Sequence, residues 1–191
     1  MRFKPVPEPP ADLAFVETVW RSVPETAGAV DDCCAHLLEE TPIADRDEAA
    51  TWLTFLRALE LATEESAGYR RRSPGPSDDA DTALERDRLR RAFRERVDGT
   101  EAILAVLADA VEHGSTSPDS QTRRDADRAL TAAAVADAVS DGPSDGERRA
   151  RRTRIEEDRI ERLLEWAVLL GLAERAENGI GYRLARGREE K

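Results

Sequence analysis

The sequence has very little lysine, few aromatic residues and only two cysteines. Lys4 and Lys191 are the only lysines among 29 basic residues, so arginine carries nearly all of the positive charge. Aromatic residues make up 5% of the chain, which predicts small hydrophobic cores. No apolar run approaches the length of about 18 residues that a membrane span needs, and the N-terminal MRFKPVPEPP lacks the apolar stretch of a secretory signal. We therefore expect a cytoplasmic protein with no membrane segment.

Patterns typical of catalysis and metal binding are also missing. Cys33 and Cys34 are adjacent, so on a helix they point about 100° apart, and no second ligand pair completes a zinc site. The two histidines, His36 and His113, stand alone among apolar or acidic residues. No nucleophile motif and no glycine-rich phosphate loop occurs. We expect packing cysteines in a reducing compartment, no enzyme activity, no cofactor and no metal ion.

The chain carries a large excess of acid. It has 40 acidic against 29 basic residues and a net charge of −11. High acid content, almost no lysine and abundant alanine and threonine resemble the composition of halophilic archaeal proteins. An excess of surface acid helps to keep a protein soluble and monomeric. We therefore interpret the acidity as a sign of habitat, and it argues neither against nucleic acid nor for a basic partner.

A helix followed directly by a hairpin is predicted near the C-terminus. Apolar residues at 160, 163, 164 and 167 recur at i, i+3, i+4 and i+7, which places them on one face of a helix. Gly171 ends this helix. Two short extended segments follow, 172–175 and 180–184, and the turn between them contains Asn178-Gly179, which is a strong hairpin signal.

The same pattern occurs earlier in the chain. When Leu61-Ala62 is aligned with Leu172-Ala173, the apolar residues of the segment that begins at Trp52 fall on those of the C-terminal helix. With two extra residues in the second hairpin, Gly68-Tyr69-Arg70 falls on Gly181-Tyr182-Arg183. An amphipathic helix does not require this shared ending. The sequence therefore predicts an internal repeat of one structural unit.

In the first unit, three helices precede the hairpin. We expect them to begin at Asp12, at a capping box formed by Ser22 to Glu25, and at Asp45. The hairpin should cover roughly residues 61–72. The run of proline, glycine, serine and aspartate at 73–79 then predicts a linker.

The second unit should repeat this order with longer helices. A heavily charged helix is expected from Asp81 to Val97, with a break at Gly99 and a helical continuation beyond it. An alanine-rich helix is expected over residues 123–139, with Leu130 on its apolar side. The last helix and hairpin complete the unit.

This order of helices and hairpin resembles the winged helix-turn-helix family. The resemblance implies a mainly α fold with small β-hairpins, built as two tandem winged-helix-like domains at 1–72 and 80–191. Members of the family usually have a short strand between the first two helices. Neither unit has a β-branched run there, so we expect a two-stranded sheet or a third strand of one or two residues.

The resemblance also implies binding to double-stranded DNA, as a transcriptional regulator or a DNA-associated factor. In the family, the third helix usually enters the major groove and the wing reaches the backbone or the minor groove. Arginine suits both roles because it binds phosphate and guanine edges bidentately. The arginines that this implication singles out are Arg148, Arg149, Arg151, Arg152, Arg154, Arg159 and Arg183, together with Arg70, Arg71 and Arg72 of the first wing.

An alternative function stays open on the sequence alone. The third helix of the first unit begins Asp45-Arg46-Asp47-Glu48, and such an acidic start would repel phosphate. The first unit could therefore bind a protein, and the whole chain could be an adaptor or a subunit of a nucleic-acid-processing complex. A homodimer is a further expectation, with the charged helix 81–97 as a candidate surface. Solvent-facing arginines would favour DNA, whereas arginines paired with acids beside an apolar patch would favour the adaptor.

Overall fold

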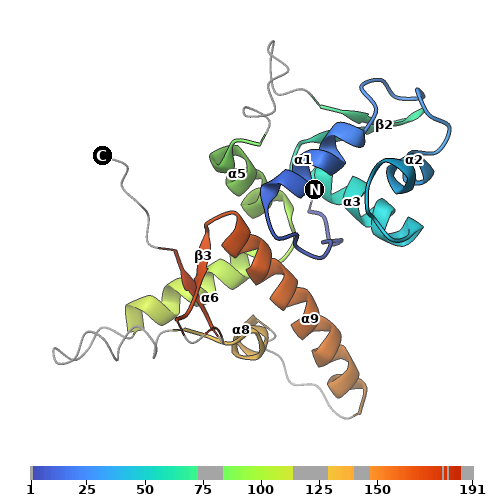
Figure 1. The fold of residues 1–191 in the computed structure, drawn as a ribbon. Helices are drawn as coiled ribbons and strands as arrows, with labels where there is room; N and C mark the ends of the chain where they lie inside the picture. Colours follow the sequence, from blue (N-terminus) through green and yellow to red (C-terminus); the bar gives the residue numbers. More distant parts are fainter. Residues whose placement is uncertain are drawn as a thin grey trace, which may run out of the picture. The chain divides into compact units, whose positions relative to one another are not determined.

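The computed structural model describes most of the chain, which divides by its internal contacts into unit 1, Met1–Asp98, and unit 2, Gly99–Lys191 (Figure 1). We describe each unit by itself. The described residues are 2–72, 84–113, 129–139, 147–177, 179 and 181–185, and the side chains of 112–113 and 147–155 are outside this description.

Unit 1 contains helices that begin where the sequence provides a capping carboxylate. Asp12, Asp32 and Asp45 each accept hydrogen bonds from the first free backbone amides of a helix. Glu48 accepts in return from the amide of Ala44, at 3.0 Å. The elements are α1 (Leu13–Ser22), α2 (Cys33–Glu40), α3 (Arg46–Ala58), β1 (Ala62–Glu65), β2 (Gly68–Arg71) and α5 (Arg86–Arg96).

The core of unit 1 is built on the aromatic residues of α1 and α3. Trp52 meets Phe15 edge-on, and Phe55 meets Phe93 of α5 in the same way. The indole of Trp20 donates a buried hydrogen bond of 3.1 Å to the carbonyl of Leu61. Seven of the nine aromatic residues of the chain lie in unit 1.

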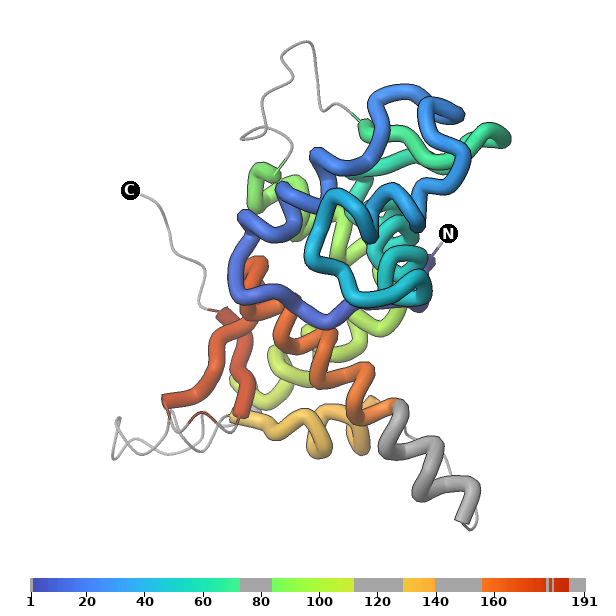
Figure 2. Tube along the Cα trace, turned by 45° about the vertical axis from the view of Figure 1, so that its right-hand side comes forward, coloured from blue at the N-terminus to red at the C-terminus, as the bar shows by residue number. Residues whose placement is uncertain are grey.

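Unit 2 packs α6 (Thr100–His113), α8 (Ala132–Val139) and α9 (Glu147–Leu169) around the hairpin of β3 (Ala173–Arg175) and β4 (Tyr182–Leu184). In Figure 2 the hairpin, drawn in red, leaves the end of α9 and runs along α6. Fully buried side chains from each helix fill the core, among them Ile103, Leu107, Val135, Leu163 and Trp166.

A third strand one residue long completes the sheet of unit 2. Leu130 forms an antiparallel bridge with Tyr182, with amide-to-carbonyl distances of 2.9 and 2.8 Å. In unit 1 the carbonyl of Pro24 accepts from the amide of Arg71. Proline has no N–H to donate in return, so Pro24 makes only half of such a bridge. The expectation of a very short third strand is therefore confirmed in unit 2.

The predicted repeat is confirmed in the backbone. Ala62 pairs with Arg71, and Ala173 pairs with Leu184, which is the register that the sequence alignment requires. The amide of Leu61 bonds to the carbonyl five residues before it at 2.8 Å, and the amide of Leu172 does the same at 2.7 Å. Both junctions between helix and hairpin are therefore made by the same hydrogen bonds.

Two helix predictions were wrong. Ser22 is the last residue of α1, and its hydroxyl bonds back to Thr18, so it caps no following helix; Asp32 caps α2 instead. Leu130 is not on a helix, because it pairs with the hairpin and Thr131 caps α8 through the amide of Ala134. The part of the predicted alanine-rich helix before residue 129, and the predicted linker 73–79, are outside the described residues.

The boundary by contacts also differs from the predicted one. Residues 80–98 were expected in the second domain, but α5 belongs to unit 1. Its buried Phe93 packs on α3, and Phe3 forms a parallel bridge with Val97. Gly99, at φ +89°, then separates α5 from α6, so the predicted break in the charged helix is confirmed.

Candidate nucleic-acid interface

The outer face of α3 presents little free positive charge. Arg46 lies 2.6 Å from Asp32, and this guanidinium holds the pKa of that carboxyl below its usual value. Arg57, the other base of α3, pairs with Glu64 of β1. Both arginines of this helix are therefore held by acids.

Helix α9 carries the arginine-rich segment at its start. Arg148, Arg149, Arg151, Arg152 and Arg154 all lie within Glu147–Leu169, while their side chains are outside the description. Helix α9 has 23 residues and α3 has 13. In the repeat, Glu157 aligns with Arg46, the first residue of α3, so the arginine-rich turns of α9 precede the part of the helix that α3 matches.

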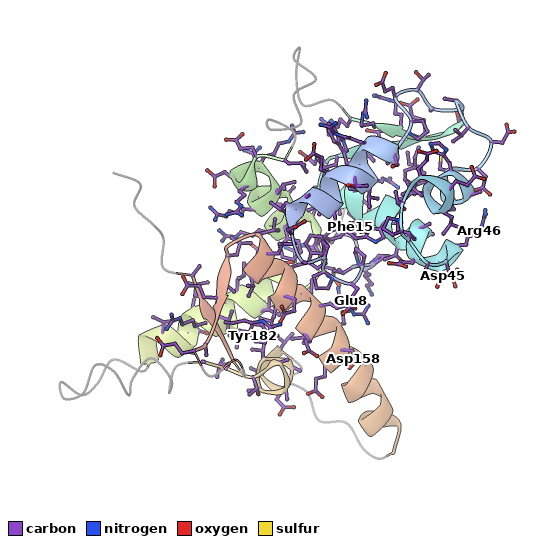
Figure 3. The ribbon with its side chains drawn as sticks, viewed as in Figure 1. Glu8, Phe15, Asp45, Arg46, Asp158 and Tyr182 are labelled. Atoms are coloured by element: carbon purple, nitrogen blue, oxygen red, sulfur yellow. The ribbon has the colours of Figure 1, made fainter. Side chains whose placement is uncertain are left out.

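The part of α9 that matches α3 has an acidic outer side. Glu157, Asp158 and Glu161 are exposed or half-buried there, with Arg162 beside them. Figure 3 shows Asp158 projecting from α9, as Arg46 projects from α3. Acids at these positions repel phosphate. Any contact of α9 with DNA would therefore have to come from its opening turns.

The tyrosine of each hairpin is bonded to the third helix. The hydroxyl of Tyr182 donates to the carboxylate of Glu165, which also lies 2.6 Å from Arg175. At the aligned position of unit 1, Tyr69 is hydrogen-bonded to Thr54. Burial raises the pKa of both tyrosines, and the Glu165 carboxylate raises that of Tyr182 further. In each unit, the repeated tyrosine therefore links the hairpin to the third helix through a side-chain hydrogen bond.

The arginines of the two wings are mostly engaged within the protein. Arg70 pairs with Glu65, and Arg183 lies 3.1 Å from Glu174. Arg71 pairs with Glu25, and its guanidinium lies 5.1 Å from the ring centre of Trp20. These contacts explain the arginine of the repeated Gly-Tyr-Arg motif as a residue that stabilises the hairpin.

Two predicted site residues have different surroundings from these. Arg72 is exposed, with no acidic partner in the part of the chain that the structure describes. Arg159 is half-buried on α9, and its guanidinium lies against Gly99, where an added Cβ would come within 3.3 Å of it. Arg159 therefore faces the start of α6, away from the outer side of α9.

A basic surface on α5 was missed as a DNA candidate. The helix contains six arginines, one aspartate and one glutamate, which gives +4 over 11 residues. The exposed or half-buried arginines with no ion pair among the described residues are Arg86, Arg88, Arg91 and Arg94. The signal was visible in the sequence, where this segment was interpreted as a dimer surface.

The fold defines a class of protein, the tandem winged-helix proteins, because each unit contains a third helix joined directly to a two-stranded wing with the same register. The chain belongs to the family described as the halobacterial double winged helix domain, whose model matches residues 1–187. Searches of curated proteins and of solved structures found no match. The family description agrees with the halophilic composition and with the repeat.

No helix in the described part of the chain is long and apolar enough to cross a bilayer. Among the same residues, no three histidine, cysteine, aspartate or glutamate side chains are grouped so as to hold a metal ion. Cys33 is buried, and burial raises the pKa of the Cys34 thiol, which disfavours a reactive thiolate.

Proposed function

We propose that this protein binds double-stranded DNA and acts as a transcriptional regulator or a DNA-associated factor. The observation that carries the proposal is the charge of the first turns of α9. Residues 147–154 hold five arginines and one acid in a chain whose net charge is −11. In helix-turn-helix proteins the N-terminal residues of the recognition helix contact base edges, and the arginine-rich turns extend this end of α9 beyond the part that matches α3.

Salt sets a condition on this function. Binding through phosphates weakens steeply as the salt concentration rises, and a halophile keeps its proteins in concentrated salt. Arginine is suited to that condition, because its weakly hydrated, planar guanidinium makes bidentate contacts to phosphate and to guanine. A homodimer bound to two half-sites would make further contacts with the DNA. We therefore also propose that DNA binding promotes dimerisation of the protein.

The test is a fluorescence anisotropy titration of a random-sequence duplex with the full chain and with the variant Arg148→Ala/Arg149→Ala/Arg151→Ala/Arg152→Ala. We expect the variant to bind more weakly, with a log–log salt slope shallower by up to about 4, because each lost phosphate contact removes about 0.9 from the slope. The opposite change on the same helix, Glu157→Gln/Glu161→Gln, should tighten binding by removing repulsion. Equal affinity for all three proteins would refute a role for α9.

A second candidate function is a protein-interaction adaptor, with unit 1 as the partner-binding module. The observation that favours it is the outer side of the two third helices: both arginines of α3 are paired with acids, and Asp158 and Glu161 of α9 are exposed. The adaptor predicts a partner protein whose capture from a cell lysate is lost in the variant Asp47→Arg, which reverses an exposed charge on α3 of unit 1. It also predicts that the full chain leaves DNA unbound at low salt, where electrostatic attraction is strongest.

A further inference from the structure

We propose that the outer face of α5 is a binding surface for the phosphate backbone of a nucleic acid, which gives unit 1 its own contact with the ligand. This inference rests on the proposed function and adds a surface that neither third helix nor wing provides. Arg91 and Arg94 lie on the outer side of α5, and Arg86 and Arg88 lie on its two flanks; we call these four residues the α5 face.

The packing of α5 fixes which of its sides is exposed. Leu89, Ala92 and Phe93 are buried against the core of unit 1, with exposed fractions of 0, 4 and 0%. Residues half a turn away from them on the helix point outward, and Arg91 and Arg94 are both exposed. Figure 3 shows nitrogen-tipped side chains projecting from this helix. The buried contacts of α5 within unit 1 therefore fix the orientation of the helix, with Arg91 and Arg94 toward solvent.

The C-terminal end of α5 is held in place separately from this face. Arg96 lies 2.7 Å from Glu60, and its guanidinium lies 5.5 Å from the ring centre of Phe3. The guanidinium of Arg57 lies 5.3 Å from the same ring. Phe3 in turn bridges to Val97 by backbone hydrogen bonds. A helix anchored by Arg96 can present its other arginines without their being needed for its stability.

The arginines of the α5 face differ from several exposed arginines elsewhere on unit 1. Arg21 pairs with Glu17 and Arg46 with Asp32, both at 2.6 Å, although Arg72 has no acidic partner among the described residues. Arg91 and Arg94 form no ion pair with the residues that the structure describes. In an acidic protein, unpaired positive charge on one helix side is what a polyanion would select.

The spacing of the arginines matches a phosphate backbone. With a rise of 1.5 Å per residue, Arg86 and Arg94 are about 12 Å apart along the helix. Phosphates of one strand advance about 3.4 Å per nucleotide along the duplex axis, so this length covers roughly three to four of them. Such contacts position a protein on a duplex and carry no sequence information. The α5 face would therefore set affinity and register, and leave base reading to other residues.

The experiment compares the full chain with two double variants that lose the same charge. Arg91→Gln/Arg94→Gln removes the centre of the α5 face, and Arg21→Gln/Arg46→Gln removes two paired arginines as the matched control. Glutamine is close to arginine in helix propensity, so α5 should persist, and circular dichroism and thermal unfolding check this. A random-sequence duplex is titrated by anisotropy from 0.05 to 2 M KCl.

We expect the α5 variant to bind at least about tenfold more weakly at 0.1 M KCl, with a salt slope shallower by about 2, because two phosphate contacts are lost. The control should bind like the wild type, and Arg91→Lys/Arg94→Lys should recover most of the affinity. If the wild type binds but the α5 variant binds equally well, or the control loses as much, the inference is wrong and the proposed function stands. If the wild type itself fails to bind, the proposed function is wrong and the inference falls with it.

Discussion

At the scale of single residues, the two units have different residue types at the same left-handed backbone position. The second residue after the end of each third helix has a left-handed backbone, with φ +71° at Gly171 and +62° at Glu60. Glycine adopts this conformation without the steric cost that a Cβ imposes. Glu60 adopts this conformation despite the steric cost, and its carboxylate is paired with Arg96. Unit 1 thus gains a link to α5 at the position where unit 2 has the less strained residue.

Replacing Gly171 by alanine should therefore destabilise unit 2 by about 1 kcal/mol, since a Cβ would be forced into the left-handed region. Glu60→Ala is the control. In this variant a residue with a Cβ occupies the positive-φ position both before and after the substitution. Only a partly exposed ion pair is lost, and its loss is expected to lower the stability by about 0 to 1 kcal/mol. Hydrogen exchange of peptides from each unit measures both effects. Equal losses in the two variants would show that backbone strain does not distinguish these positions.

The pKa of Tyr182 gives a prediction for alkaline pH. Burial and the neighbouring Glu165 carboxylate raise this pKa in the folded protein, while an unfolded tyrosine ionises near pH 10. The folded state then holds the proton more tightly, so stability from this group is intact below pH 10 and is lost as the pH rises above it. Tyr182→Phe should make the decline above pH 10 shallower by up to about 1.4 kcal/mol per pH unit. Denaturant unfolding from pH 8 to 11.5 measures it, and an unchanged decline would contradict this account.

At the scale of the elements, the one-residue third strand depends on a close approach. A Cβ built on Gly181 would lie 2.8 Å from the Cβ of Ala129, a distance that real structures avoid. Gly181→Ala should separate Leu130 from Tyr182 and cost about 1 to 3 kcal/mol, as overpacking does elsewhere. The double variant Gly181→Ala/Ala129→Gly should recover much of this loss. Thermal unfolding and amide exchange at Leu130 measure the loss of stability in the single variant and its recovery in the double variant. If Ala129→Gly did not restore stability, the contact between residues 181 and 129 would not be the cause of the loss.

Local signals explain which elements could be predicted from the sequence. Asp12 and Asp45 cap helices beside apolar repeats, and Asn178-Gly179 marks a hairpin, so these predictions needed only neighbouring residues. Leu130 could not be placed in the same way, because its strand exists only through a partner fifty-two residues later, Tyr182. The candidate site was predictable as a list of arginines. Their acidic partners were not, since Arg71 and Glu25 meet only in the folded chain.

At the scale of the whole molecule, the assignment of α5 to unit 1 has a consequence for fragments. Fragment 1–98 retains Phe93 against Phe55 and the bridge from Phe3 to Val97. Fragment 1–72, which ends at the boundary predicted from the sequence, loses both. We expect 1–98 to unfold cooperatively and 1–72 to be several kcal/mol less stable, because burying a phenylalanine and a leucine side chain stabilises by about 1.5 to 3 kcal/mol each. Equal stability of the two fragments in urea would show that α5 is dispensable to the fold.

The charged residues are unevenly distributed over the whole molecule. The chain is acidic overall, yet arginine is concentrated in the first turns of α9 and on the outer face of α5. Most arginines of α3 and of the wings have acidic partners instead. Under the proposed function, the arginines of α9 and α5 would contact the polyanion, while the paired arginines of α3 and the wings stabilise the fold.

The most direct test of the central claim, DNA binding by this double winged-helix protein, is the dissociation constant of the wild-type chain for a random-sequence duplex, measured from 0.05 to 2 M KCl. We predict a straight line of log affinity against log salt with a slope of about −4 or steeper, which corresponds to four or more phosphate contacts. Absence of binding at 0.05 M KCl, or an affinity that does not change with salt, would contradict it.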